Sequence, residues 1–147
     1  MSGEGEFLGA RWDINKPWGW DSQHEWQWSL TCNPIAQLRG GPPGADVKFI
    51  CEVFRLDGLL TLALAGHAGH QEAYEKALAL WRTLLQEHQP FKGILYLVGI
   101  ESAFRVVKCL ILNQVFAADY TSTDIMLVWR FLYGQQQWIR RYPSLDS

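Results

Sequence analysis

The chain has 147 residues, of which 48% are hydrophobic and 19% charged, and its formal net charge is −2. This balance predicts one folded domain with a substantial core and excludes a disordered chain. Its positive charges are scattered, with Arg140-Arg141 the only doublet, so the sequence disfavours a nucleic-acid partner, which needs clustered cations.

Three cysteines, an odd number, stand in apolar surroundings without the spacing of metal ligands. They predict small buried thiols in a reducing compartment, and the default expectation is a cytoplasmic protein. The first residues lack the apolar stretch of a secretory signal, and no apolar run is long enough to cross a bilayer, so no membrane partner is expected.

The first part of the chain, residues 1–45, is a Trp-rich arm that ends in the helix-breaking run Gly40-Gly41-Pro42-Pro43-Gly44. A more regular body, residues 46–147, follows it. The arm is too short to fold alone without a disulfide or a metal. We therefore expect one structural domain, in which the arm packs on the body or on a partner.

Five of the eight tryptophans lie before residue 30. The alternation of apolar and polar residues predicts a strand at 25–31, with Trp26 and Trp28 facing a hydrophobic layer that is either the core or an interface. Trp18 and Trp20 flank a glycine after a proline, so they are the candidates for exposed rings that contact a ligand or another chain. A membrane role fits poorly, because the arm is not a cationic amphipathic helix.

The body opens with a β-rich run at 47–56, and Asp57-Gly58 separates it from a second apolar run that ends at 66. Asp-Gly between apolar runs is a strong hairpin signal, so the sequence predicts a hairpin of strands 47–56 and 58–66.

Helical periodicity and Pro90 predict a helix at 70–88, the most secure element. The apolar run 93–99 predicts a strand buried on both faces, which completes a right-handed crossover with the preceding strand and helix. Residues 101–117 are apolar on most sides and predict a second, largely buried helix.

The final element, residues 122–141, has two interpretations. A capping-box pattern from Thr121 to Asp124 and a basic pair at the end favour a helix. The apolar run inside it, followed by a glycine, also fits a strand hairpin. The helix is the preferred interpretation.

Together these elements predict an α+β fold. Its small mixed sheet has about four strands, formed by the hairpin and the crossover, with helices on one face. The run from Arg55 to Gly99 resembles the strand–turn–strand–helix–strand core of STAS domains, which act mostly through partner or ligand binding. The similarity rests on pattern alone, and the Asp-Ser phospho-acceptor pair of that family is absent, so we do not assign the chain to it.

A polar turn from His67 to Glu72 is the most suggestive cluster in the body. Helix N-terminal amides and glycines there are suited to receive an anion, with His67 or His70 as an acid or base, although the two histidines also fit a simple helix cap. With Trp18 and Trp20 these groups would line a ligand pocket. No complete metal set and no catalytic or nucleotide motif is present, so no metal, cofactor or catalytic residue is predicted.

The sequence favours a non-enzymatic binding or interaction module that acts through an aromatic surface and associates with itself, as a homodimer or higher oligomer. The alternative is a small-molecule-binding protein or enzyme with a pocket between the Trp arm and the His67–His70 turn, and the sequence leaves open whether the protein is an enzyme. A third hypothesis, stacking of single-stranded nucleic acid, requires salt-sensitive binding.

Overall fold

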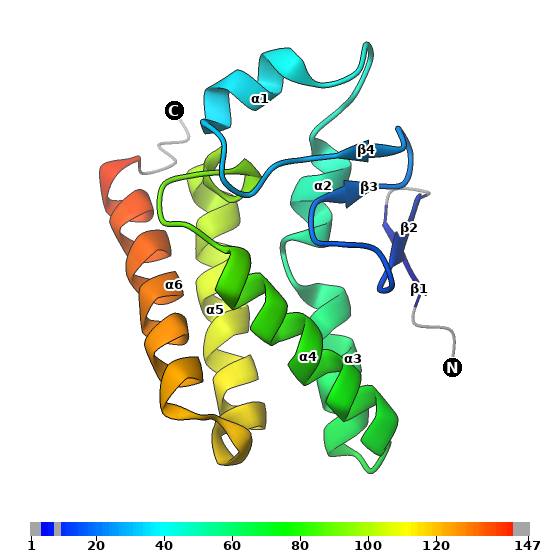
Figure 1. Cartoon of the computed structure of the whole chain (residues 1–147), viewed down its shortest axis with the longest axis vertical. Coiled ribbons are helices and arrows are strands. Elements are labelled where there is room, and N and C mark those ends of the chain that lie inside the picture. The colour runs from blue at the N-terminus through cyan, green and yellow to red at the C-terminus, as the bar shows by residue number, and fades with distance from the viewer. Residues whose placement is uncertain (1–3, 8–9, 143–147) are drawn as a thin grey trace.

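The structure, a computed structural model, describes residues 4–7 and 10–142. Helices make up most of these residues, and two separate pairs of short strands lie in the arm (Figure 1). In chain order the elements are β1 Glu4–Phe7, β2 Ala10–Asp13, β3 Trp20–Asp21, β4 Trp26–Gln27, α1 Pro34–Gly40, α2 Lys48–Val53, α3 Asp57–His67, α4 Gln71–Glu87, the 3-10 helix η1 Ile94–Tyr96, α5 Gly99–Phe116, the 3-10 helix η2 Ala117–Asp119 and α6 Ser122–Arg141.

The predicted α+β fold is wrong. Each two-stranded antiparallel pair, β1 with β2 and β3 with β4, stands by itself, and no mixed four-stranded sheet forms among the described residues. The body contributes no strand to either pair. Its helices bury their apolar faces against one another, which is the alternative way for such segments to make a core.

The predicted hairpin at 47–56 and 58–66 is two helices, α2 and α3. In α3 the buried residues Leu59, Ala63 and Gly66 recur at spacings of four and three, which is the spacing of one helix face. The chain turns between the helices at Leu56, which is fully buried and has φ 68°, in the left-handed region. Asp57, the residue that suggested a hairpin turn, is instead the first residue of α3.

The predicted strand at 93–99 is also absent. The side chains of η1 are all buried, as the apolar run indicated, but the backbone is helical there and α5 begins at Gly99. Gly93 has φ 76° and donates its N–H to the carbonyl oxygen of Cys32 at 2.7 Å. This bond ties the segment to the arm rather than to a sheet.

Of the predicted strand at 25–31, only the two residues of β4 are in a strand. Its partner β3 is equally short, and beyond it the backbone of Trp28 donates to the carbonyl oxygen of Gly19 at 2.9 Å. The chain then turns into α1, so the alternation has too few paired residues to fix which side chains share a face.

The predicted helices are confirmed. The helix at 70–88 is α4, and the helix at 101–117 is α5 with an earlier start. The helical interpretation of 122–141 is confirmed by α6, whose N-terminus is a capping box. Thr121 Oγ1 accepts from the Asp124 backbone N–H at 3.1 Å, and the Asp124 carboxylate accepts from the Thr121 N–H at 2.8 Å.

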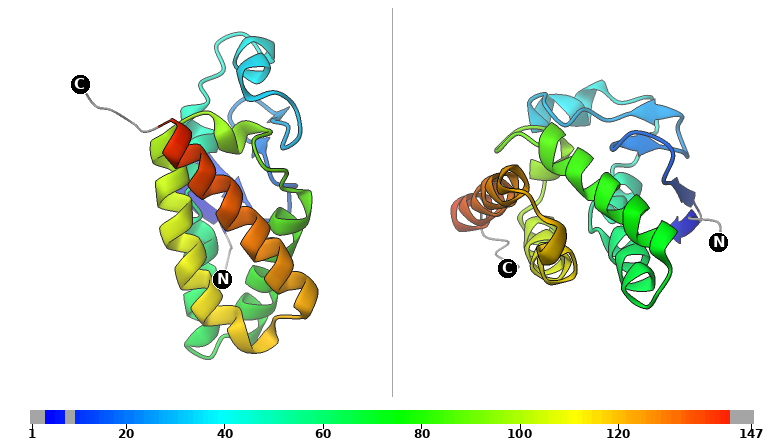
Figure 2. Two further views of the ribbon diagram at one scale, coloured as in Figure 1. Left: turned by 90° about the vertical axis from the view of Figure 1, so that its left-hand side faces the viewer. Right: turned by 60° about the horizontal axis from the view of Figure 1, so that its bottom comes forward.

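Helices α5 and α6 run antiparallel side by side and form one side of the molecule, while the strands of the arm lie on the opposite side (Figures 1 and 2). Helix α4 packs between them and against α3. One hydrophobic core joins the arm to helices α2–α6. Across the part of the chain that the structure describes, no helix has the length and apolar character needed to cross a membrane.

Close packing of α3 on α4 depends on Gly66. A Cβ added at this residue would lie 2.5 Å from both the Cα and the Cβ of Tyr74 on α4, closer than non-bonded carbons approach. The atoms it would meet belong to or adjoin a helix backbone, which has little freedom to move. The side-chain-free face of Gly66 therefore sets the distance between the two helices.

We expect Gly66→Ala to lower the free energy of unfolding by about 1–3 kcal/mol, the usual cost of overpacking a core. The matched control is Gly40→Ala at the end of α1, where an added Cβ meets nothing within 4 Å. Because alanine is the better helix former, the control should leave stability unchanged or raise it by up to about 1 kcal/mol. Urea denaturation measures both, and equal losses would contradict this account of the α3–α4 contact.

Candidate functional site

The structure divides both pairs of arm tryptophans that the sequence grouped. Trp18 and Trp28 are buried, with 4% and 2% of their surface exposed. Trp26 is 39% exposed, and Trp20 is half-buried beneath Lys16, whose Nζ lies 5.1 Å from its ring centroid. The prediction that the Trp18 ring is exposed is therefore wrong, and of the two alternatives for Trp26, the core and an interface, the core is excluded.

Trp18 fixes the arm to the helical body. Its ring centroid lies 5.5 Å from that of Trp12 and 5.5 Å from that of Phe54, at the end of α2. Its indole N–H donates to the carbonyl oxygen of Leu80, on α4, at 2.8 Å. Both the apolar ring and its single donor are thus satisfied inside the protein.

Trp28 fills a second position in the core. Its indole N–H donates to the buried carboxylate of Asp21 at 3.2 Å, and the same carboxylate oxygen lies 2.9 Å from Nδ1 of His24. A Cβ added at Gly41 would lie 2.8 Å from the Trp28 ring. The glycine-rich run after α1 therefore lets the chain pass directly over this tryptophan.

We expect Trp28→Ala to lower the free energy of unfolding by about 3–5 kcal/mol, as for other large core truncations. Trp26→Ala, in the same arm but at an exposed position, should change it by no more than about 0.5 kcal/mol. Chemical denaturation of the two variants compares them directly. Similar losses would mean that the arm does not divide into a core tryptophan and a surface tryptophan.

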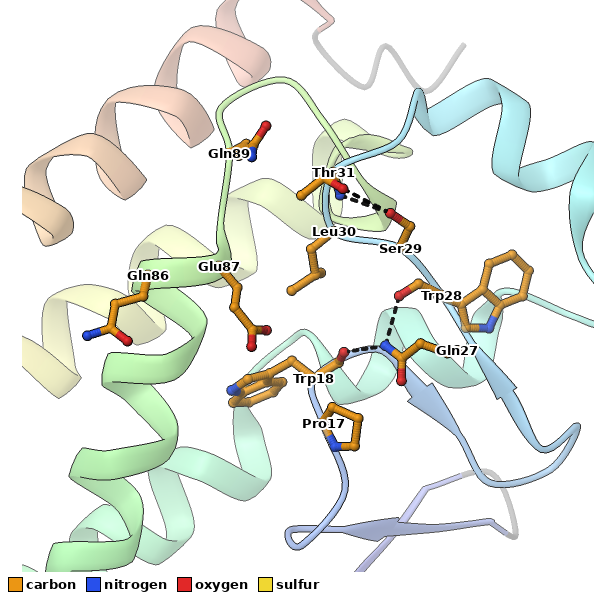
Figure 3. Close-up of a pocket in the computed structure, with 10 residues that line it drawn as sticks. All are labelled: Pro17, Trp18, Gln27, Trp28, Ser29, Leu30, Thr31, Gln86, Glu87 and Gln89. Atoms are coloured by element: carbon orange, nitrogen blue, oxygen red, sulfur yellow. Dashed lines mark hydrogen bonds between the residues drawn. The ribbon is translucent and has the colours of Figure 1, made fainter.

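An open hollow of about 610 Å³ lies between the arm and the C-terminal end of α4 (Figure 3). The carboxylate of Glu87 points into it, and burial raises the pKa of this group. The hollow is lined by Pro17, Trp18, Gln27, Trp28, Ser29, Leu30, Thr31, Gln86, Glu87 and Gln89. Because the two tryptophan rings are packed in the core, they leave little surface on which a ligand could stack.

The predicted histidine turn does not meet this hollow. His67 ends α3, His70 precedes α4 and Glu72 lies in the first turn of α4, and all three are exposed. Glu87 is fifteen residues beyond Glu72 on the same helix, about 22 Å away at 1.5 Å per residue. Searched over the described residues, no group of three or more His, Cys, Asp or Glu side chains could hold a metal ion.

A fully buried guanidinium, that of Arg105, lies where η1, α5 and α6 meet. Its Nη2 donates to the carbonyl oxygen of Leu95 and to Oγ of Ser102 at 3.1 Å, and its Nε donates to Oε1 of Gln135 at 3.0 Å. Burial lowers its pKa to about 10, which still leaves it charged at neutral pH. The neutral acceptors around it thus hold a positive charge inside the fold.

His88 and Tyr96 lie beside this charge. Nε2 of His88 is 2.5 Å from the hydroxyl of Tyr96, and both side chains are almost completely buried. Among the residues that the structure describes, three buried polar atoms of the same cluster have no hydrogen-bond partner: Nδ1 of His88, Nε2 of Gln135 and Nε1 of Trp138. His88, Tyr96 and Gln135 are at most 1% exposed, and Trp138 at the edge of the cluster is half-buried.

Burial, together with the charges of Arg130 and Arg105, lowers the pKa of His88 from 6.5 to about 3. Between these values the unfolded chain takes up a proton that the folded chain does not, so stability that is present above about pH 6.5 is lost as the pH falls. We expect a loss of up to about 1.4 kcal/mol per pH unit from this residue.

The variant His88→Gln, which cannot titrate, should therefore show a shallower fall in unfolding free energy between about pH 6 and pH 4 than the wild type. Denaturation at several pH values measures the two slopes. His67→Gln, at the exposed end of α3, controls for the loss of a histidine as such. Equal slopes in His88→Gln and the wild type would show that His88 is not held neutral.

The N-terminal half of α5 buries polar side chains and exposes apolar ones. Its polar residues Glu101, Ser102 and Arg105 are buried, whereas the apolar Phe104 and Val107 are 41% and 55% exposed. An ordinary surface helix has the reverse arrangement. The prediction that α5 is largely buried is thus wrong for its outer side.

Helix α6 extends this exposed surface. Met126, Trp129 and Tyr133 recur at spacings of three and four and so share its outer side, and Trp129 is 68% exposed. We name the combined surface the α5–α6 face. It consists of Ile100, Phe104, Val107, Leu110, Ile111, Ile125, Met126, Trp129 and Tyr133.

None of the nine residues of the α5–α6 face is charged. Each charged side chain of the two helices before Arg140 makes a hydrogen bond or an ion pair with another part of the fold, and among them Arg130, next to Trp129, is exposed. Arg105 is the buried charge described above. Three others form ion pairs: Glu101 with Arg55 at 2.7 Å, Lys108 with Asp57, and Asp124 with Arg82 at 2.8 Å. The last, Arg130, donates to the carbonyl oxygens of Leu85 and His88 at 2.8 and 3.0 Å.

The whole chain was compared with protein-family models, with curated proteins and with solved structures, and it matches none of them. What the α5–α6 face does has to follow from its own chemistry. Large exposed apolar patches mark sites of interaction with another protein or a membrane, or ligand-binding grooves.

Proposed function

We propose that the protein is a non-enzymatic interaction module whose α5–α6 face docks on another protein surface. The observation that carries the proposal is the size of this apolar face. Its nine side chains are 39–68% exposed and present on the order of 900 Å² to solvent, taking 150–250 Å² for each whole aromatic residue. The largest apolar patch of a typical monomer is about 300–600 Å².

The composition of the face supports the same proposal. Trp, Tyr, Phe and Met are enriched in the buried centres of protein interfaces, where charged residues are depleted. The face presents one of each: Trp129, Tyr133, Phe104 and Met126. Trp and Tyr are also the residues that most often dominate binding energy.

Other features favour binding over catalysis and over a small-molecule site. The strongly perturbed groups His88, Tyr96 and Arg105 are at most 1% exposed, out of reach of a substrate. The hollow beside the arm lies at the opposite end of α4 from His70. A cytoplasmic setting stays part of the proposal, and the three free cysteines are in keeping with a reducing compartment.

A photoreactive amino acid in place of Trp129 tests the function. In cells that produce the full chain, irradiation should yield protein adducts at this position, whether with other copies or with a different protein. The matched control places the same group at Ala79, an exposed residue of α4. Adding Val107→Glu to the Trp129 variant should remove the adducts, because a charge in the middle of an apolar interface is left unpaired.

The proposal would be wrong if position 129 formed no adducts, formed them as often as position 79, or kept them in the presence of Val107→Glu. Circular dichroism of each variant establishes that the helices are retained.

A further inference from the structure

We infer that the occupant of the α5–α6 face is a second copy of this chain, related to the first by a two-fold axis. Helices α5 and α6 of one copy then pack on α5 and α6 of the other. The inference rests on the proposed function, since it names the partner of the same surface.

The absence of charge points to self-association. In a two-fold interface the same patch is present on both sides, so residues near the axis meet their own counterparts. A charged residue there would face an identical charge, whereas every residue of the α5–α6 face is uncharged. A partner of a different kind is usually selected by complementary charges, and the exposed charge beside this face, Arg130, already donates to carbonyl oxygens of α4.

The area of the face fits a stable dimer. A standard interface buries about 800 Å² on each partner. The α5–α6 face presents on the order of 900 Å² of largely apolar surface, so a second copy would cover it completely. Helices α5 and α6 lie on the side of the molecule away from the strands of the arm (Figure 2), and the nine side chains of the face are exposed in the described chain.

Charges at the two ends of α6 select the direction of the axis. Arg140 and Arg141 are exposed at its C-terminal end, and Asp119, whose carboxylate also accepts from the Tyr74 hydroxyl, is exposed just before its N-terminal end. An axis along the helices would bring the two basic pairs together. An axis across the helices makes α6 antiparallel to its counterpart and brings each basic pair toward Asp119 of the second copy.

The length of α6 agrees with this arrangement. The helix has 20 residues and is about 30 Å long. Trp129 and Tyr133 lie on either side of its middle, so an axis across the helix places them at the centre of the interface. Large aromatic side chains at an interface centre, surrounded by smaller apolar ones, are the usual arrangement of strong contacts.

Sedimentation velocity of the purified full chain over a wide concentration range is the test. The wild type should approach twice the 16.9 kDa chain mass. Trp129→Glu should weaken the dimer by roughly thirtyfold or more, the effect of losing a central hot spot. Trp26→Glu is the matched control, an exposed tryptophan on the arm, and it should sediment like the wild type.

The variant Val107→Lys, on α5, repeats the test on the other helix of the face. It also replaces Trp129→Glu if circular dichroism shows that the latter has lost its helices. The pair Arg140→Glu and Arg141→Glu should weaken the dimer several-fold at low salt and by less at high salt. A stronger dimer in this last variant would overturn the axis across the helices.

The dimer and the proposed interaction function can fail separately. A chain that stays monomeric at all concentrations, but whose photoreactive residue 129 forms adducts with other proteins, overturns the second copy and leaves the interaction module standing. A monomeric chain without adducts overturns both. A dimer that is lost in Trp26→Glu and kept in Trp129→Glu places the interface on the arm and overturns the role of the α5–α6 face.

Discussion

The buried guanidinium of Arg105 is the constraint on which the arrangement of the last third of the chain depends. It joins η1, α5 and α6, because its acceptors are Leu95, Ser102 and Gln135. A buried charge is tolerated only when its donors are matched, so these three segments have to keep their positions together. Placing Arg105 inward also fixes the rotation of α5 about its axis. The apolar side chains on the far side of that helix, Phe104 and Val107 among them, then have to face outward.

The elements that could be predicted are those whose signals are local. Helix α6 has its capping box at Thr121 and Asp124, and α4 has a clear apolar stripe and a proline beyond its end. The segment 47–66 could not be predicted in the same way, because Asp57-Gly58 after a β-rich run is the pattern of a hairpin. Packing overrode that pattern: the buried positions of α2 and α3 have helical spacing, and the reversal is made one residue earlier, at Leu56. Propensity is weak where tertiary contacts decide.

The candidate site was harder to predict than the fold, for a related reason. A helix that is apolar on nearly all sides fits a core equally well as an interface, so the sequence of α5 does not show that its outer side is exposed. Local alternation likewise grouped Trp26 with Trp28, although only the second reaches the core. The sequence does carry one signal, because the charged side chains of Glu101 and Arg105 need partners inside the fold. Because these two charges stand in a largely apolar helix, one of its sides has to satisfy them, and the opposite side is then left exposed.

Leu56 shows how narrow the choice of residue becomes where backbone and side chain make opposing demands. Its left-handed backbone suits glycine, whereas its fully buried position calls for a large aliphatic side chain. Glycine would relax the backbone and open a void. Valine or isoleucine would fill the space, but a β-branched side chain is strongly disfavoured at a positive φ, and asparagine would carry an amide into an apolar site. Leucine is the compromise among these. The joint between α2 and α3 is therefore a position where the common engineering rule of placing glycine at a left-handed residue would work against the protein.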